Sequence, residues 1–179
     1  MTAPAEPAWL PALFSMSPWS PAVIEALYAV FRRDFVDNPA CYQNCEVWFF
    51  PERERGKELI FWHLVEREDP PRSGNRLPDF RRAERLPWAR AMLDHLDDPA
   101  VLHWDYAEGD GDIHTYVWLQ ALDYLIVMKK YRDGRRRLIT AFWLEYENKR
   151  RTRVRQFIGK NRQFRNAAPA FIGVSAPVF

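Results

Sequence analysis

The stretch that decides the fold is residues 101–143, which read VLHWDYAEGDGDIHTYVWLQALDYLIVMKKYRDGRRRLITAFW. Apolar and polar residues alternate through it, as in half-buried strands. Turn residues divide it at 109–111, at 120–123 and at Asp133-Gly134, and Asp-Gly between alternating runs favours a tight hairpin. We therefore predict four strands over residues 101–106, 113–119, 124–131 and 135–146. The last has apolar residues on both faces, which predicts a central position in the sheet.

Upstream of this stretch the pattern predicts helices and two further strands. Ser20-Pro21 is typical of a helix start, and the helix should end near residues 35–38, ahead of Pro39. Residues 46–50 and 57–62 are predicted as strands. Helical spacing returns over residues 79–96, where Pro87 predicts a kink or a break into two short helices.

These elements define an α+β fold, with N-terminal helices packed on an antiparallel sheet of four or more strands. A chain of 179 residues fits one domain with appendages. We divide it into a proline-rich arm (1–21), the domain itself (22–155) and a basic, apolar tail (156–179). The arm carries enough apolar residues that we expect it to pack on the domain.

Composition narrows the class of protein. Hydrophobic residues make up 47% of the chain and aromatic residues 15%, which excludes a disordered or fibrous protein. The longest uncharged apolar run, residues 124–128, is too short for a membrane span. No Lys or Arg precedes Arg32, so a secretory signal is not expected, and only two cysteines occur. We therefore expect a reducing, cytoplasmic location and no membrane partner.

Neither a metal nor a cofactor is expected. Cys41 and Cys45 are spaced C-x3-C with no second cysteine pair, which makes a poor zinc site. The chain contains no Gly-x-x-x-x-Gly-Lys loop that would hold a nucleotide phosphate.

Charge is distributed unevenly along the chain. Residues 1–128 hold 12 Lys+Arg against 21 Asp+Glu, a balance of −9, whereas residues 129–165 hold 14 against 3, a balance of +11. Such a basic segment suits a polyanion such as RNA. It could equally form a solvated face or pair with the acidic half of the same chain.

Several motifs together resemble the barnase/EndoU/colicin/RelE-like (BECR) nuclease superfamily, in its phage- and toxin-associated branch. They are Phe61-Trp62-His63-Leu64, Arg76-Leu77-Pro78-Asp79, the run from Arg82 to Trp88, Tyr124-Leu125-Ile126-Val127-Met128 and Leu138-Ile139-Thr140-Ala141-Phe142. The resemblance spans about residues 22–155. It implies helices on a four-stranded antiparallel sheet and metal-independent RNA cleavage. Many members of the superfamily are toxins or phage-associated proteins.

Metal-independent RNA cleavage needs a base, an acid and a group that stabilises charge on the phosphorane. His63, expected at a strand end beside Glu66, is a candidate base or acid, or else a histidine bonded to backbone. Arg82 and Arg85 should share a helix face and clamp a phosphate, with Glu84 between them; the alternative is a solvated face. Thr140 would donate to phosphate or simply fill the sheet.

A hairpin over residues 101–119 offers a second acid–base possibility. Alternation places His103 and Asp105 on one face of the first strand, and His114 and Tyr116 on one face of its partner. If the strand register pairs these two sets, an imidazole and a carboxylate would meet across the strands. Otherwise the four residues lie on the exposed face of the hairpin.

The basic segment supplies the candidate RNA-binding residues. They are Lys129, Lys130, Arg135, Arg136, Arg137, Tyr146, Arg150 and Arg151. The stretch 148–165 interleaves cations with Phe157 and Phe164, which suits single-stranded RNA. It could also form a helix that docks Val154, Phe157 and Ile158 on the domain.

The sequence thus predicts a metal-independent endoribonuclease that leaves a 2′,3′-cyclic phosphate, with RNA as its partner and an antitoxin or immunity protein as a possible second one. Two alternatives stay open. One is a non-catalytic RNA-binding or protein-interaction module of the same fold, and the other is a structural protein whose basic stripe neutralises an acidic partner.

Overall fold

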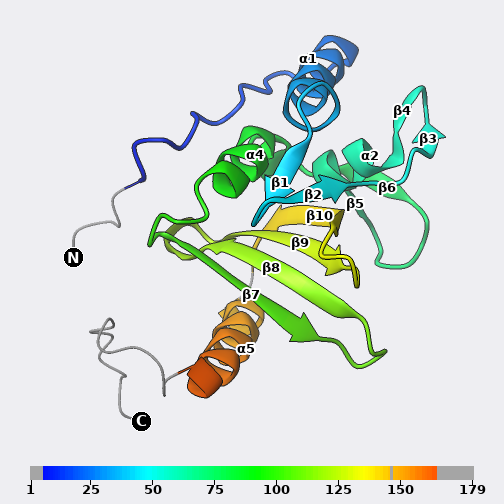
Figure 1. The fold of residues 1–179 in the computed structure, drawn as a ribbon. Coiled ribbons are helices and arrows are strands. Elements are labelled where there is room, and N and C mark those ends of the chain that lie inside the picture. Colours follow the sequence, from blue (N-terminus) through cyan, green and yellow to red (C-terminus); the bar gives the residue numbers. More distant parts are fainter. Residues whose placement is uncertain (1–5, 146, 165–179) are drawn as a thin grey trace.

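The protein is a mixed α+β domain built on a curled sheet of six strands, as a computed structural model describes it for residues 6–145 and 147–164 (Figure 1). The strand order is β1-β2-β10-β9-β8-β7. All neighbouring pairs are antiparallel except β2 and β10, which run parallel.

The four C-terminal strands form a meander close to the predicted ranges. They are β7 (Val101–Ala107), β8 (Ile113–Leu119), β9 (Tyr124–Lys130) and β10 (Arg136–Trp143). Gly134 has φ +89° in the β9–β10 turn, a conformation that glycine adopts without a Cβ clash. The prediction that the last strand is central is confirmed, because β10 lies between β2 and β9.

The other edge of the sheet comes from the hairpin of β1 (Ala40–Tyr42) and β2 (Cys45–Trp48). β2 joins β10 only through the pairs Val47 with Arg136 and Trp48 with Arg137. Beyond Arg137, therefore, β10 has no strand neighbour on this side. Two small hairpins lie outside the main sheet: β3 (Arg53–Glu54) with β4 (Lys57–Glu58), and β5 (Glu66–Glu68) with β6 (Arg76–Pro78).

The strand predicted at residues 57–62 is wrong. Only Lys57 and Glu58 are extended, and the next residues form helix α2 (Leu59–Val65). Five of its seven residues are buried. A short segment that is apolar on almost every side has no alternation or helical stripe that could separate the two structures.

The remaining helices begin as predicted. α1 (Pro21–Phe31) starts at Ser20, whose Oγ accepts a hydrogen bond from the Val23 amide at 3.3 Å, and a π-helical turn at Arg32–Val36 follows it. The predicted break at Pro87 is confirmed, because α3 (Phe80–Ala83) and α4 (Leu86–Asp94) are separate helices.

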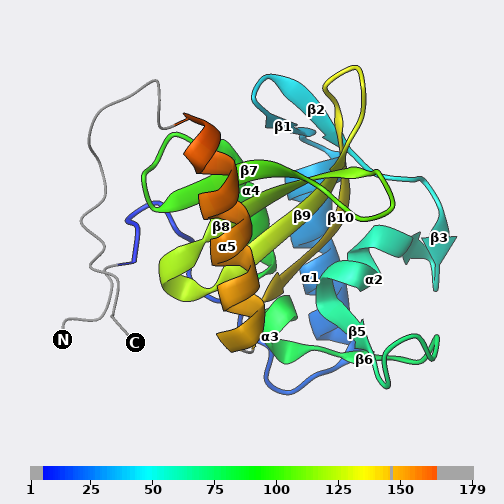
Figure 2. The same cartoon turned by 90° about the horizontal axis from the view of Figure 1, so that it is seen from below.

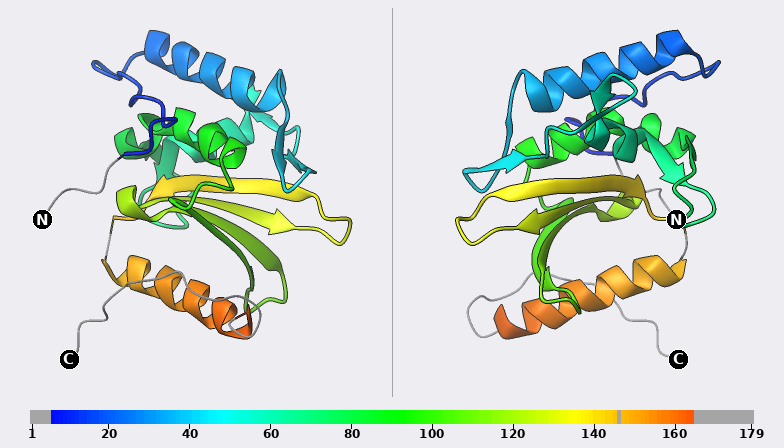
Figure 3. Two further views of the ribbon diagram at one scale, coloured as in Figure 1. Left: turned by 60° about the vertical axis from the view of Figure 1, so that its left-hand side comes forward. Right: turned by 90° about the vertical axis from the view of Figure 1, so that its right-hand side faces the viewer.

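Helices cover both faces of the sheet (Figures 2 and 3). α2 and α4 pack on one face with α1 outside them, around a core that includes Phe31, Phe61 and Met92. α5 (Glu147–Phe164) crosses the opposite face, where Trp104 and Phe157 belong to a second apolar cluster. Among the helices described, none is long and apolar enough to cross a membrane.

The proline-rich arm packs on the domain through tryptophans. The Trp9 ring stacks on His95 with centroids 4.5 Å apart, and its Nε1 donates to Asp98 at 2.7 Å. Trp88 of α4 donates in turn to the Pro11 carbonyl at 2.8 Å. The expectation that the arm contacts the domain is thus confirmed from residue 6 onward; residues 1–5 lie outside the described part of the chain.

Candidate functional site

The free edge of β10 is where the residues singled out from the sequence come closest together. α2 and α3 both contact β10. The pairing of β10 with β9 also shifts between Leu138 and Thr140, which leaves Ile139 in a bulge. Bulges re-aim side chains and are common beside binding sites.

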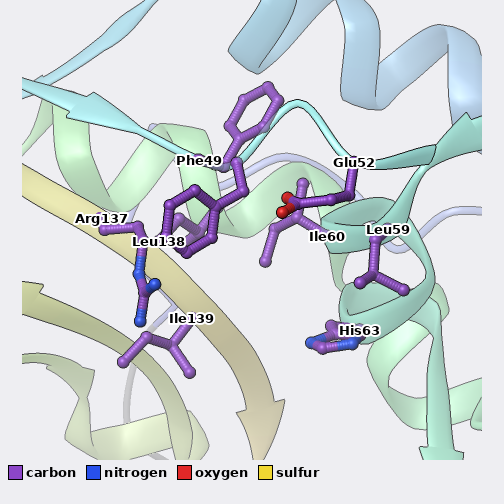
Figure 4. A pocket seen from close by; sticks show the side chains of 9 residues that line it. Phe49, Glu52, Leu59, Ile60, His63, Arg137, Leu138 and Ile139 are labelled. Atoms are coloured by element: carbon purple, nitrogen blue, oxygen red, sulfur yellow. The ribbon is translucent and has the colours of Figure 1, made fainter.

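A pocket of about 170 Å³ opens at the bulge, between β10, α2 and the loop that follows β2 (Figure 4). Its walls are largely apolar, but Glu52, His63 and Arg137 also line it. In Figure 4 the Glu52 carboxylate, the His63 ring and the Arg137 guanidinium stand on three sides of the same space. The other lining residues are Phe49, Phe50, Leu59, Ile60, Leu138 and Ile139.

Hydrogen bonds hold the loop that carries Glu52 against α2. The Leu59 amide donates to the Glu52 carbonyl at 2.8 Å, and Trp62 Nε1 donates to the Glu54 carbonyl at 2.7 Å. Arg55 then clamps the buried Glu66 carboxylate with two hydrogen bonds of 2.9 and 2.6 Å. These bonds fix the position of Glu52 relative to His63, even though the Glu52 side chain itself is exposed.

His63 lies in the last turn of α2, not at a strand end as predicted. It is half-buried, and burial lowers the pKa of its imidazole below the ordinary 6.5, with further lowering by Arg76 and Arg82. A histidine of this kind loses its proton easily, which suits proton transfer near neutral pH.

Arg137 is the candidate cation of the pocket. Its guanidinium carbon lies 4.5 Å from the centre of the Phe50 ring, and among the described residues no carboxylate lies within 4.0 Å of it. Its positive charge still helps to lower the pKa of Asp112, so Arg137 lines the pocket with carboxylates in its neighbourhood but with no ion pair within 4.0 Å among the described residues.

Arg82 and Thr140 meet His63 through its backbone. Arg82 Nη1 donates to the His63 carbonyl at 3.0 Å, to the Glu66 carbonyl at 3.3 Å and to Thr140 Oγ1 at 3.3 Å. Thr140 Oγ1 also lies 3.4 Å from the His63 carbonyl, to which it donates. Arg82 thus binds a carbonyl in the last turn of α2 and the carbonyl of Glu66, the residue that follows the helix, where a helix leaves acceptors without partners.

The two arginines predicted to clamp a phosphate both bind groups of the chain itself, and they do not share a helix face. Arg82 belongs to α3, which ends at Ala83, whereas Arg85 lies between α3 and α4, which begins at Leu86. Arg85 Nη1 donates to the Arg81 carbonyl at 3.0 Å and to the Glu84 carboxylate. The Glu84 carbonyl accepts from the Phe14 amide of the arm at 2.7 Å.

Two lysines of the β9–β10 hairpin pair with the acidic half of the chain. Lys129 binds Asp112 and Lys130 binds Asp105, both at 2.6 Å, whereas Arg135 binds Asp133 of its own turn at 2.7 Å. The pairing that composition left open is therefore present here, and it reduces the positive field of the hairpin.

Arg136 is not at the surface as predicted. Its side chain is 5% exposed, its Nε donates to Thr115 Oγ1 at 2.7 Å, and its Nη1 donates to the Gly134 carbonyl. A buried guanidinium with these partners has no face left for a phosphate of RNA.

The remaining RNA-binding candidates lie at or near α5. Arg150 Nε lies 3.1 Å from Asp123 Oδ1, Arg151 is exposed on the helix, and Tyr146 lies outside the described residues. Val154 and Phe157 pack on the apolar cluster under the helix, which confirms the docking alternative for these two; the Ile158 side chain is not described. α5 is continuous across residues 155 and 156.

The hairpin of β7 and β8 does not bring an imidazole to Asp105. Asp105 faces Thr115, whose Oγ1 donates to it at 2.6 Å. His103 Nδ1 lies 2.8 Å from the Tyr42 hydroxyl, and His114 lies 3.7 Å from Glu108. The acid–base pair considered for this hairpin is therefore absent.

A second, larger groove of about 570 Å³ lies further along the same edge of β10. Arg82, Phe142 and Trp143 line it together with Arg67, Asp79 and Glu145, so it combines cations, carboxylates and aromatic rings. His63 lines the first pocket and Arg82 the second, and the hydrogen bond from Arg82 to the His63 carbonyl connects the two.

Comparisons with protein-family models, with curated proteins and with solved structures found no match for this chain. Within the described residues, no three His, Cys, Asp or Glu side chains gather as a set of metal ligands.

Sequence reasoning found His63, Thr140 and Arg137 but missed Glu52. Glu52 belongs to a charged turn with Arg53 and Glu54. Nothing in the sequence of that turn indicates which of the two carboxylates lies at a functional site. Only the contact of the loop with α2 selects Glu52.

Proposed function

We propose that this protein is a metal-independent endoribonuclease whose active site is the pocket lined by Glu52, His63 and Arg137. The observation that carries the proposal is the presence of a carboxylate, a half-buried imidazole and a guanidinium around one small pocket. These are the three kinds of group that cleavage through the ribose 2′-hydroxyl requires.

In the proposed reaction the Glu52 carboxylate takes the proton of the 2′-hydroxyl as its oxygen attacks phosphorus. The P–O5′ bond breaks, and protonated His63 gives its proton to the leaving oxygen. Arg137 stabilises the negative charge that grows on the phosphoryl oxygens. The products are a 2′,3′-cyclic phosphate and a 5′-hydroxyl, so the proton and electron pairs balance without a further reactant.

The lowered pKa of His63 sets the pH range of this reaction. A weaker base is a stronger acid, so imidazolium at this position donates its proton readily. The same shift means that less of His63 is protonated at neutral pH. Cleavage should therefore weaken as pH rises above the His63 pKa, which lies below 6.5.

We further propose that the fold is a variant of the BECR nuclease arrangement. Support comes from helices on the face of an antiparallel meander and from the position of His63 on a helix next to Thr140 of a central strand. In this arrangement Arg82 acts as a positioning residue, because it holds the carbonyl of His63 itself.

A non-catalytic RNA-binding module is the second candidate. The observation that favours it is that Arg82 and Thr140, two residues that the sequence offered as catalytic candidates, are bound to backbone carbonyls of the chain. Under this alternative the pocket binds a nucleotide and the chemistry does not occur.

The deciding experiment is incubation of the purified protein with end-labelled RNA in EDTA, at pH 5.5 and pH 8.0. We expect cleavage that is faster at pH 5.5 and falls by about 10²-fold or more in Glu52→Gln, His63→Gln and Arg137→Met.

Matched controls replace the same residue types outside the pocket. Glu46→Gln, His95→Gln and Arg135→Met should retain cleavage within about twofold, since none of these residues lines the pocket. RNA that is bound but never cut by the wild type would favour the non-catalytic module. Cleavage that survives in all three pocket variants would overturn the site.

A further inference from the structure

We propose that the protein holds a monoatomic anion, chloride, in a buried site between α3, α4 and β9, where Tyr124, Arg82 and Arg85 donate hydrogen bonds to it. The inference goes beyond the proposed function and does not depend on it, because the ion takes no part in the cleavage of RNA. It concerns what completes the hydrogen bonding of the domain interior.

Three buried donors in this region lack an acceptor. Tyr124 is fully buried, and its hydroxyl has no hydrogen-bond partner among the described residues. The same holds for the Nε atoms of Arg82 and Arg85. Burial of such groups without a partner is costly, so nearly all buried polar groups in proteins have one, supplied by the chain, by a water molecule or by an ion.

Ring contacts place these donors around the first turn of α4. The Trp88 ring of that turn meets the Tyr124 ring at 84°, with centroids 5.7 Å apart. The Arg85 guanidinium carbon lies 5.1 Å from the centre of the same Trp88 ring. Burial raises the pKa of Tyr124, whereas the charges of Arg82 and Arg85 lower it. Both guanidinium groups therefore act on the Tyr124 hydroxyl, which points toward them.

The charges of this region favour an anion. Arg85 is the N-cap residue of α4, no side chain caps this nine-residue helix, and its first turn contains no acidic residue. The positive end of the helix dipole therefore adds to the two guanidinium charges. Asp79, whose Oδ2 lies 3.2 Å from Arg82 Nε, and Glu84, which is bonded to Arg85, offset part of that positive charge.

The kind of unpartnered group separates chloride from a water molecule. A water molecule in a buried site needs acceptors for its own protons as well as donors. The three unpartnered atoms of Tyr124, Arg82 and Arg85 all carry a hydrogen to donate. A halide accepts from all three and needs no acceptor in return, so it satisfies this set more completely than water does.

The proline-rich arm covers the site. The Phe14 amide donates to the Glu84 carbonyl at 2.7 Å, and Trp88 Nε1 donates to the Pro11 carbonyl at 2.8 Å. The arm therefore lies across the junction of α3 and α4, and the three donor atoms are inaccessible to solvent. Attraction between an anion and its donors is stronger in such an environment than in water.

Replacement of chloride by a large anion tests the site in the intact chain. Thermal unfolding at pH 7.5 is followed by circular dichroism in sodium chloride, sodium bromide or sodium gluconate at equal ionic strength. An ion that binds only the folded state raises its stability, and gluconate is too large for a site of three converging donors. We expect the Tm of the wild type to be roughly 3 °C higher in chloride or bromide than in gluconate.

Tyr124→Phe removes one donor and keeps the aromatic ring. We expect it to lower Tm in chloride and to abolish the difference between chloride and gluconate. The matched control Tyr106→Phe, at a half-buried tyrosine of β7, should keep that difference. A hydroxyl without any ligand predicts the opposite result, because its removal would relieve an unpaired buried group and raise Tm.

Three outcomes would overturn the inference. They are an equal Tm of the wild type in chloride and gluconate, a higher Tm of Tyr124→Phe than of the wild type in chloride, and a chloride effect that persists in Tyr124→Phe. Crystals grown in bromide give the direct measurement. Anomalous scattering should place a bromide ion within hydrogen-bond distance of the Tyr124 hydroxyl, and a water molecule or no density at that position would contradict the proposal.

Discussion

Arg82→Met is the substitution that best separates a structural role of this arginine from a direct role in binding RNA. Arg82 is largely buried, and burial lowers the pKa of its guanidinium. Its Nη1 donates to two backbone carbonyls and to Thr140, and its Nε lies 3.2 Å from Asp79 without hydrogen-bond geometry. Methionine fills a similar volume but leaves the Glu66 carbonyl without this donor.

The expected cost follows from the bonds that are lost. A hydrogen bond from a charged donor contributes about 1.5–3 kcal/mol, and relief from burying the guanidinium offsets part of that loss. The His63 carbonyl keeps Thr140 as a donor. We therefore expect the free energy of unfolding to fall by about 2 kcal/mol, which lowers Tm by roughly 4–8 °C for a domain of this size.

Thermal unfolding followed by circular dichroism at pH 7.5 measures this change. Arg135→Met serves as the control, because Arg135 is an exposed cation that pairs with Asp133 of its own turn and lies 5.7 Å from the centre of the Trp48 ring, and its Tm should change little. An Arg82→Met variant with the Tm of the wild type but without affinity for RNA would refute the structural role and restore the phosphate clamp.

Three further predictions concern stability. Burial lowers the pKa of His63 and of His103 below 6.5, so the unfolded chain binds more protons than the folded one at acidic pH. The stability that these two histidines contribute is fully present at pH 7 and is lost as pH drops below 6.5, so Tm should fall over that range. A Tm that rises on acidification from pH 7 would contradict this. Gly134→Ala should lower the free energy of unfolding by about 1–3 kcal/mol in a urea titration. The reason is that φ is +89° at this residue and an added Cβ would lie 3.0 Å from Cys45 Sγ. A variant as stable as the wild type would show that the turn adopts another conformation. Phe157→Ala should lower the free energy of unfolding by about 1–3 kcal/mol and shift tryptophan emission to longer wavelength, since it removes an aromatic ring that covers the apolar sheet face. Unchanged emission would mean that α5 does not shield that face.

Local patterns predicted much of the fold. The meander follows from alternation and turn residues, and its turns at Gly134 and at residues 109–111 lie where Gly and Asp predicted them. The start of α1 follows from Ser20-Pro21, and the break between α3 and α4 follows from Pro87. In each case residues close in sequence determine the structure.

The parts that could not be predicted depend on contacts between distant residues. α2 is buried on nearly all sides, so its residues carry no periodicity that distinguishes a helix from a strand. The parallel pairing of β2 with β10 joins Val47 to Arg136, and no local sequence feature of either strand predicts this pairing.

The candidate site has the same dependence on topology. His63 and Thr140 stood out by residue type, but their contact runs through the His63 carbonyl, which is invisible in a sequence. The pairing of Lys129 with Asp112 and the burial of Arg136 likewise follow from strand register. Net charge along the chain therefore overstated the positive surface of the hairpin.

The account is tested most directly by the chemical nature of the RNA ends after reaction in EDTA at pH 5.5. Mass spectrometry of a short RNA treated with the wild type should find a 2′,3′-cyclic phosphate on one fragment and a 5′-hydroxyl on the other. Both should be absent after treatment with Glu52→Gln or His63→Gln. Intact RNA under these conditions, or fragments that carry a 5′-phosphate, would contradict the claim that Glu52, His63 and Arg137 form a ribonuclease site.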